Sequence, residues 1–301
     1  MTTADQTTAT QDVARLVTAT ELAELKDRPG VVVLDATSII RQPDGDGFYD
    51  AATGRDVHEE GHVPGAVFAD LLEDLADRSN PDFWTALPPE DFAEKIGALG
   101  VGNDTTVVVY DQGQTMWATR LWWNLRYVGH DDVLVLDGGL PAWRAAGLEV
   151  AAGASPAPEP RTFVAHPRPE LYADVDSVAA AIDDPRTVLV NSLDRATFTG
   201  ERVTYARAGR IPGSKHIFFG DLLDADGLAA EVDQVRETGD AAEVIDGEPS
   251  VITYCGGGIA ATYVAFQLAR AGRGDVAVYD GSMTEWANNP ALPLETGEPV
   301  A

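Results

Sequence analysis

The chain has 301 residues, 45% of them hydrophobic, and its 49 acidic and 21 basic residues give a net charge of −28. This length predicts two domains, each large enough to bury a core. The negative charge excludes nucleic acid and anionic membranes as partners. A single cysteine excludes an internal disulfide framework and a cysteine-rich metal site, and we expect neither a metal nor another cofactor.

The apolar runs predict a soluble protein. The N-terminal stretch MTTADQTTATQDVARL has no cationic start and no long apolar run. No later window reaches the roughly 18 apolar residues that a membrane span needs. We therefore expect a cytoplasmic monomer. The acidic residues are scattered along the chain, which is typical of a surface adapted to high salt, where the screening length falls to about 3 Å at 1 M.

The first half alternates short apolar runs with helical stretches. In chain order these are a buried strand in 31–39 (VVVLDATSI), the segment 60–75 (EGHVPGAVFADLLEDL), a strand in 105–111 (TTVVVYD), a helix in 118–129 (ATRLWWNLRYVG) and a strand opening 132–147 (DVLVLDGGLPAWRAAG). The runs lack polar alternation, which is the pattern of strands covered on both faces.

The second half repeats this order of elements. Its segments are 186–194 (RTVLVNSLD), 208–223 (AGRIPGSKHIFFGDLL), 249–255 (PSVITYC), 261–272 (ATYVAFQLARAG) and 275–290 (DVAVYDGSMTEWANNP). Corresponding points lie 143 to 156 positions apart, a period that fits a duplicated domain. The matched residues are His62 with Arg210, Asp111 with Cys255, Asp137 with Asp280, and Asp35 with Asn191.

A linker is predicted between the two copies. Residues 151–170 (AAGASPAPEPRTFVAHPRPE) are rich in proline and small residues, which cannot continue a helix or a central strand. The sequence thus predicts a first domain at 12–150 and a second at 171–301. Each is expected to be an α/β unit with a mainly parallel β-sheet flanked by helices.

The only cysteine, Cys255, stands where a strand ends and a glycine run begins. Three glycines (256–258) let successive backbone N–H groups curl around one centre. The helix that follows, entered through Ile259, Ala260 and Ala261, adds the positive end of its dipole. A thiol in this loop is expected to be a reactive thiolate. The alternative is a buried cysteine that only fills the core.

The first copy provides an internal control. Asp111 stands at the position that matches Cys255, and the loop after it (QGQTMWA) has one glycine instead of three. Fewer amides should therefore converge on an anion there. We expect the second copy to be chemically active and the first to be structural.

The ordered set of GHVPGA, GRIPGS, CGGGIA and YDGSMTEW resembles the two-domain rhodanese family of thiosulfate and 3-mercaptopyruvate sulfurtransferases. The resemblance implies an enzyme in which the Cys255 thiolate takes a sulfane sulfur from a small-molecule donor, holds it as a persulfide within the loop 256–261, and passes it to cyanide or a thiol. The loop resembles the CGSGVT of the mercaptopyruvate branch more than the basic loop of thiosulfate enzymes. It departs from that branch at Gly257 and Ala260, which replace a serine and a threonine.

The same resemblance implies cationic residues that bind the donor. The family places one arginine before an F-x-G segment and another before the HIPGA segment, and Arg195, Arg202 and Arg207 are the candidates here. Arginine suits bidentate capture of carboxylates and sulfonates. His62 matches the histidine of HIPGA, which implies a part in proton handling with Asp56 as its partner. The other four histidines show no constellation and are expected to be structural.

Two other functions compete with this interpretation. A phosphatase on the same fold would need an arginine six positions after the cysteine, where this chain has Ala261. A non-enzymatic sulfur carrier or regulatory rhodanese-like protein would keep the cysteine but lack substrate groups. A nucleotide site is disfavoured because CGGG contains neither G-x-G-x-x-G nor a P-loop lysine.

Overall fold

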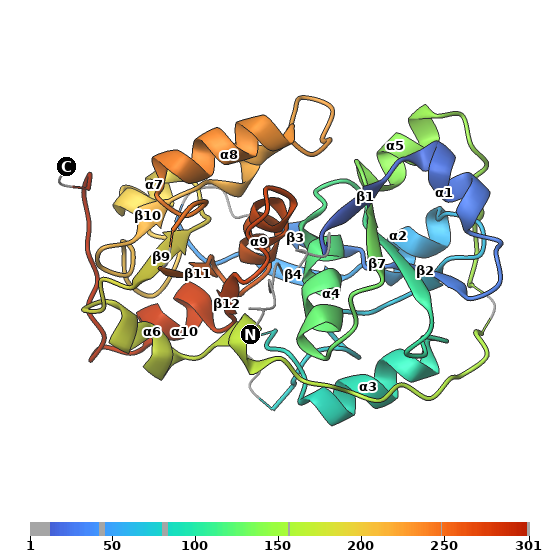
Figure 1. Cartoon of the computed structure of the whole chain (residues 1–301), viewed down its shortest axis with the longest axis horizontal. Helices are drawn as coiled ribbons and strands as arrows, with labels where there is room; N and C mark the ends of the chain where they lie inside the picture. The colour runs from blue at the N-terminus through green and yellow to red at the C-terminus, as the bar shows by residue number, and fades with distance from the viewer. Residues whose placement is uncertain (1–12, 42–45, 80–83, 156, 248, 300–301) are drawn as a thin grey trace, which may run out of the picture.

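The computed structural model describes residues 13–41, 46–79, 84–155, 157–247 and 249–299, and the predicted domain limits at 12 and 301 lie outside them. Two α/β units lie side by side (Figure 1), and each contains a five-stranded parallel sheet flanked by helices. The predicted fold class is therefore confirmed. No helix of the described residues is long and apolar enough to span a membrane.

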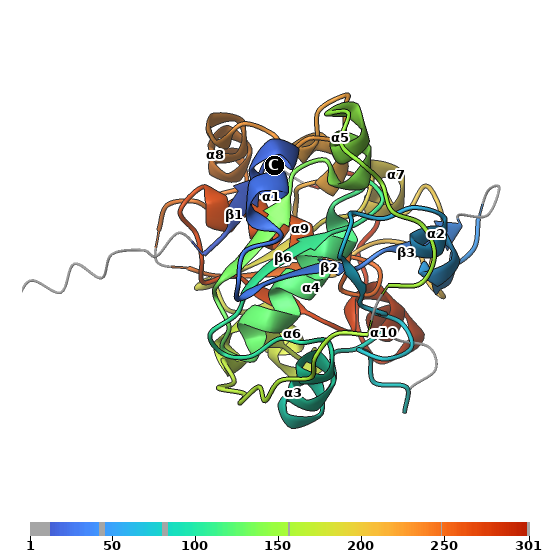
Figure 2. The same cartoon turned by 90° about the vertical axis from the view of Figure 1, so that its right-hand side faces the viewer.

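The first unit has the strand order β1, β7, β6, β2, β5, and all neighbours are parallel. Helices α1 and α5 cover one face of this sheet, and α3 and α4 cover the other (Figure 2). Cover on both faces explains why the strands are apolar throughout. The bounds are β1 (Arg15–Val17), α1 (Ala19–Leu25), β2 (Val31–Asp35), α2 (Arg55–Glu60), β5 (Val67–Phe68), α3 (Pro89–Ala98), β6 (Thr106–Tyr110), α4 (Met116–Tyr127), β7 (Val133–Leu136) and α5 (Gly139–Ala145).

The second unit repeats this topology with the order β10, β9, β11, β12, β8, again parallel throughout. Strand β11 takes the central place that β6 takes in the first unit. The bounds are the 3₁₀ turn η1 (Pro169–Leu171), β8 (Tyr172–Ala173), α6 (Val175–Ala181), β9 (Thr187–Asn191), α7 (Arg195–Thr199), β10 (Lys215–His216), η2 (Phe219–Leu222), α8 (Val232–Ala241), β11 (Ser250–Tyr254), α9 (Ala260–Arg270), β12 (Ala277–Tyr279) and α10 (Ser282–Asn288).

Helices α4 and α9 join the two units at the centre of the molecule (Figure 1). Every residue of α4 from Met116 to Arg126 is buried, and so are all but the last of α9. A helix buried on all sides is expected to be largely apolar around its circumference, and α9 is. Helix α4 also buries Arg120 and Arg126, whose guanidiniums donate to carbonyls of the second unit. Thr119 and Thr262, at matching positions of the two helices, meet with their hydroxyls 3.2 Å apart.

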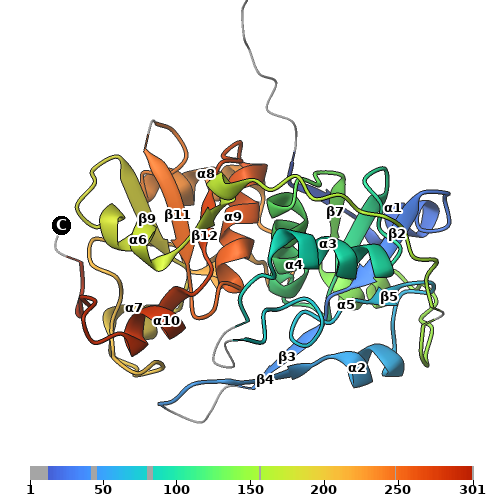
Figure 3. The ribbon, with the colours of Figure 1, turned by 90° about the horizontal axis from the view of Figure 1, so that it is seen from below.

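The predicted strand 31–39 is split in the structure. It forms β2 to Asp35 and then β3 (Ser38–Arg41), because the Asp35 carboxylate accepts a hydrogen bond from the Thr37 amide at 3.0 Å and turns the chain. Strand β3 pairs antiparallel with β4 (Asp50–Thr53). This hairpin runs from the first unit toward α7 and α10 of the second (Figure 3). There the Gly47 amide donates to the Val203 carbonyl at 3.0 Å.

The segment between α5 and η1 contains no regular helix or strand among its described residues. It follows the first unit, where the amides of Arg161 and His166 donate to the carbonyls of Gly97 and Val128 at 2.9 and 2.8 Å. Phe163 anchors it in the core with 6% of its surface exposed. The connection is thus extended and fixed to the surface of one unit.

Candidate active site

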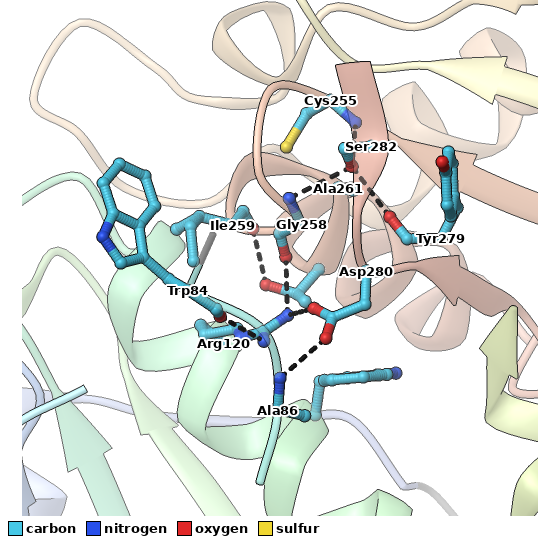
Figure 4. Close-up of polar contacts among 12 residues, drawn as sticks. Trp84, Ala86, Arg120, Cys255, Gly258, Ile259, Ala261, Tyr279, Asp280 and Ser282 are labelled. Carbon is cyan, nitrogen blue, oxygen red and sulfur yellow. Dashed lines mark hydrogen bonds and ion pairs between the residues drawn. The ribbon is translucent and has the colours of Figure 1, made fainter. Parts of the chain in front are cut away.

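Cys255 lies at the carboxyl end of β11, where the loop 255–259 leads into α9 (Figure 4). It is a free thiol and only 3% exposed. The carboxyl ends of parallel strands are the usual place for ligands in α/β sheets. The described residues hold no group of three or more His, Cys, Asp or Glu that could share a metal ion.

Hydrogen bonds to Ser282 anchor this loop to the start of α10. The Ser282 hydroxyl accepts hydrogen bonds from the amides of Cys255 and Gly258, both at 3.1 Å, and donates to the Tyr279 carbonyl at 2.7 Å (Figure 4). Ser282 itself has a left-handed φ of 49°, a conformation that such a bonded environment can hold. Sequence reasoning used this segment only as a mark of the family and gave Ser282 no role.

The loop carbonyls are also tied to α10. The Cys255 carbonyl accepts from the Met283 amide at 3.1 Å. The Gly256 carbonyl accepts from the amide and the hydroxyl of Thr284 at 2.9 and 2.7 Å. These bonds fix the orientation of two successive peptide planes.

Arg120 of α4 fastens the far end of the loop from the other unit (Figure 4). Its guanidinium pairs with Asp280 at 2.5 Å and donates to the carbonyls of Gly258 and Trp84 at 3.1 and 3.0 Å. Asp280 also accepts from the Ala86 amide at 2.7 Å. Both charged side chains are fully buried, so each depends on the other to offset its desolvation. Sequence reasoning missed Arg120 because its partners lie far away in the chain.

The anchored carbonyls determine where the loop amides point. In a trans peptide the carbonyl and the following N–H point in opposite directions. The amides of Gly256, Gly257 and Ile259 therefore point away from α10 and Arg120, toward the pocket that these three residues line. None of the three has a hydrogen-bond acceptor among the described residues. The loop thus presents converging donors that suit an anion.

Two of the three glycines are required by the structure. A Cβ at Gly256 would overlap the hydroxyls of Tyr49 and Tyr205. Gly258 has a φ of 71°, which a side chain disfavours. Gly257 is different, because its φ is not left-handed and a Cβ there would meet only an aromatic ring at 3.4 Å. A serine could therefore occupy position 257.

The pocket beside Cys255 has a volume of about 560 Å³ and is lined by both units. Of the three predicted arginines, only Arg202 lines it. The Arg202 guanidinium forms an ion pair with Asp194 and donates to the Thr197 hydroxyl at 3.1 Å. Its side chain remains 39% exposed, which leaves donors free for a ligand.

The other two arginines lie elsewhere. The Arg207 guanidinium donates to four backbone carbonyls at the end of α10, those of Trp286, Ala287, Asn289 and Leu292. The last carbonyls of a helix have no partner within it, and an arginine is well suited to satisfy them. Arg195 pairs with Glu298 on the surface. The structure brings neither to Cys255.

His62 and Asp56 do not line the Cys255 pocket. His62 is 3% exposed, donates through its Nδ1–H to the His58 carbonyl at 2.8 Å, and stacks on the His58 ring with the ring centres 4.1 Å apart. Its backbone pairs with Ala151, and the matching Arg210 pairs in the same way with Glu295. Asp56 is exposed on α2. The backbone of His62 thus holds the segment after α5, at Ala151, against the first unit.

Two tyrosines that sequence reasoning missed lie over the loop. Tyr49, from the hairpin of the first unit, and Tyr205, from the second, form a hydrogen bond through their hydroxyls and line the pocket with Cys255. Burial raises the pKa of both phenols, Tyr49 raises that of Tyr205 further, and a thiolate at Cys255 acts on both in the same direction. Both are therefore protonated near neutral pH. No local pattern marks either residue in the sequence.

The loop after Asp111 corrects the expectation that few amides converge there. The Asp111 carboxylate turns inward and accepts hydrogen bonds from the amides of Gly113, Thr115, Trp117 and Ala118, at 2.8 to 3.1 Å. Asp111 is 1% exposed, and this burial raises its pKa while the amides oppose the shift. One glycine is enough because Thr115 also takes a left-handed φ, of 58°. The first copy keeps the anion cradle and fills it with its own side chain.

Fold and site together define a duplicated α/β protein with one cysteine in an anion-binding loop, and comparisons with known proteins agree. A model of the rhodanese-like domain matches residues 18–146 and 174–289. The chain is 35% identical over 292 residues to a probable 3-mercaptopyruvate sulfurtransferase of Pseudomonas aeruginosa, and the alignment covers 95% of this chain and 99% of that protein. It is 34% identical over 267 residues to the thiosulfate sulfurtransferase of Bos taurus, with 86% and 85% covered.

Solved structures show the same architecture. The anaerobic ergothioneine biosynthesis enzyme from Chlorobium limicola, in complex with trimethyl histidine, superposes with a TM-score of 0.81 at 26% identity, covering 96% of this chain and 72% of that one. The wild-type structure of EanB gives 0.80 at 26% identity, with 95% and 70% covered. The chain belongs to the rhodanese family of sulfurtransferases, and the resemblance inferred from the sequence is confirmed.

Proposed function

We propose that the protein moves a sulfane sulfur from 3-mercaptopyruvate or thiosulfate to a thiol or cyanide through a persulfide on Cys255. The observation that carries this proposal is the set of three loop amides, from Gly256, Gly257 and Ile259, that point into the pocket without an acceptor. Converging N–H groups bind anions, and the outer sulfur of a persulfide is one. Relatives named for both donors support the reaction class.

The reaction has two displacement steps. The Cys255 thiolate attacks the outer sulfur of the donor, and the bond that held this sulfur breaks with its electron pair leaving on the pyruvate enolate or on sulfite. The acceptor thiolate or cyanide carbon then attacks the outer sulfur of the persulfide, and Cys255 leaves as a thiolate. The loop amides and the N-terminus of α9 stabilise the negative sulfur in both states.

We propose that Arg202 binds the anionic end of the donor. It is the one predicted arginine that lines the pocket, and its guanidinium can hold a carboxylate or a sulfonate while it remains paired with Asp194. The loop 256–261 contains no cation, which favours 3-mercaptopyruvate over the more highly charged thiosulfate. We leave Arg195, Arg207, His62 and Asp56 out of the proposed donor site.

We propose further that residues 171–301 form the catalytic domain and that residues 12–150, joined to it by the linker 151–170, form a rhodanese-like domain without catalytic activity. The Asp111 carboxylate supports this assignment, because it occupies the amides that would otherwise bind a transferred sulfur. The first domain contributes Arg120, Trp84 and Tyr49 to the site of the second.

The test compares wild type and Cys255→Ser with each donor, using cyanide as acceptor and thiocyanate as readout. We expect turnover with both donors, a higher kcat/KM for 3-mercaptopyruvate, and one added sulfur on Cys255 by mass spectrometry when the acceptor is left out. The serine variant should lose more than about 99% of activity, because its hydroxyl forms no persulfide. A persulfide that forms but never turns over would indicate a sulfur carrier.

We also propose a cytoplasmic monomer whose acidic surface is adapted to high salt. The net charge of −28 supports this, since self-repulsion destabilises a compact chain until salt screens it. The unfolding midpoint should rise as KCl is increased from 0.1 to several molar, and the mass in solution should match one chain. A midpoint that stays constant or falls with KCl would contradict salt adaptation.

A further inference from the structure

The hydroxyls of Tyr49 and Tyr205 meet directly over the backbone of the active loop. A Cβ at Gly256 would overlap both oxygens, so both lie against the residue next to Cys255. The two phenols hydrogen-bond to each other and line the same pocket as the thiol. They come from different units, so only the assembled chain creates this pair. The pair therefore places two hydroxyls in the pocket, against the loop that holds Cys255.

The loop itself offers no hydroxyl, since residues 256–261 are three glycines, an isoleucine and two alanines. Thr197 and Thr204 line the pocket, but the Thr197 hydroxyl already donates to Asp194 at 2.9 Å, and the Thr204 hydroxyl then donates to Thr197 at 3.2 Å. The hydroxyl of Ser282 is likewise committed to the Tyr279 carbonyl. The two tyrosines can therefore supply a proton that neither the loop nor these neighbours can give.

We propose that the Tyr49 and Tyr205 pair is the general acid that protonates the pyruvate enolate when 3-mercaptopyruvate gives up its sulfur. This inference rests on the proposed function. As the S–S bond to Cys255 forms, the C–S bond of the donor breaks and its electron pair passes to the pyruvate enolate. One phenol gives its proton to the enolate carbon and becomes a phenolate. Water entering the open pocket returns the proton afterwards.

A pair suits this task better than a single phenol. When one tyrosine loses its proton, the hydroxyl of the other donates a hydrogen bond to the phenolate, and bonds to charged groups are about twice as strong as neutral ones. Burial and the nearby sulfur anion raise both pKa values, so the proton stays on the pair until a strong base such as an enolate forms. Thiosulfate is different, because its leaving sulfite needs no proton.

The experiment measures kcat/KM for both donors in Tyr49→Phe, Tyr205→Phe and the control Tyr172→Phe. Tyr172 lies on β8, packs against both Trp123 and Tyr127, and is not a pocket residue. Each pocket variant should lose about 10²-fold or more with 3-mercaptopyruvate, the usual range for a general acid. Thiosulfate turnover should stay within about twofold, as should both activities of the control. The solvent deuterium isotope effect on pyruvate release should change only in the pocket variants.

The possible results distinguish a failure of this inference from a failure of the proposed function. Equal losses with both donors would show that the tyrosines only shape the pocket, and unchanged 3-mercaptopyruvate turnover would show that another group supplies the proton. Both results overturn the inference, and so does a wild type that uses thiosulfate alone. Formation of the Cys255 persulfide from thiosulfate shows that each variant is folded. A wild type that forms no persulfide with either donor refutes the proposed function instead.

Discussion

The two halves of the chain carry the same anion-binding loop, and they differ in what occupies it. In the first half the Asp111 carboxylate accepts four loop amides. In the second half Cys255 stands at the matching position, and the amides of Gly256, Gly257 and Ile259 have no acceptor among the described residues. In the first copy the chain's own carboxylate satisfies the loop amides. In the second copy the three amides remain available to a bound anion.

The surroundings of the two loops are related in the same way. The Ala86 amide of the first half donates to Asp280, and the Ala229 amide of the second half donates to Asp137, at 2.7 and 2.8 Å. The two contacts are equivalent, because Ala229 lies 143 positions after Ala86 and Asp280 lies 143 positions after Asp137. Each unit therefore contributes a segment, around Ala86 in the first and around Ala229 in the second, that hydrogen-bonds to an aspartate of the other unit. The contacts that support the two loops are therefore reciprocal.

The symmetry ends at Arg120. The residue 143 positions later is Tyr263, whose hydroxyl donates to the Leu222 carbonyl at 2.8 Å. Arg120 instead forms a buried ion pair with Asp280 and holds the Gly258 carbonyl. The catalytic loop thus has a charged cross-domain support that the filled loop does without, because a carboxylate bound by four amides already fixes its own loop.

The largest effect should come from making the second loop like the first. Cys255→Asp should abolish sulfur transfer and change the free energy of unfolding by no more than about 1 kcal/mol, because the loop amides would offset the desolvation of the carboxylate. Activity assays and denaturant unfolding measure both quantities, with Cys255→Ala as the inactive control. A loss of several kcal/mol relative to Cys255→Ala would show that the two cradles are not equivalent.

Removal of the cross-domain support should have the next largest effect. Arg120→Met should lower the free energy of unfolding by about 3 to 5 kcal/mol, because it leaves Asp280 buried without its partner. It should also reduce kcat/KM, since the Gly258 peptide plane is released. The matched change Tyr263→Phe should cost only about 1 kcal/mol and leave activity intact. Similar results for the two variants would refute a special role for Arg120.

The smallest effect should come from returning a thiol to the first loop. Asp111→Cys in a Cys255→Ala background should form no persulfide with either donor, although amides converge at that position. The segment from Gly227 to Ala229 of the second unit lies against this loop, where a Cβ at Gly227 would come 3.4 Å from the Gly113 carbonyl oxygen. The pocket that Arg202 lines includes Cys255 but not Asp111. Mass spectrometry would show an added sulfur at residue 111 if the cradle alone were sufficient.

The sequence by itself determined the duplicated α/β architecture and the place of the thiol. These follow from local patterns: apolar runs covered on both faces, glycines that allow a curled backbone, and a repeat that keeps its spacing. The anchored loop at Cys255 agrees with that prediction, and so does the family. The expectation of few converging amides after Asp111 was wrong, because the number of glycines does not show that Thr115 adopts a left-handed φ.

Only the tertiary structure decided which side chains reach the thiol. Arg207 lies close in sequence to Arg202, yet its guanidinium donates to four carbonyls at the end of α10, and of the three candidate arginines only Arg202 lines the pocket. Tyr49 and Arg120 come from the other unit, and their partners in the second unit, Tyr205 and Gly258, lie more than 130 positions away. A side chain's choice of partner depends on which groups remain unsatisfied after the chain has packed, and no local pattern contains that information.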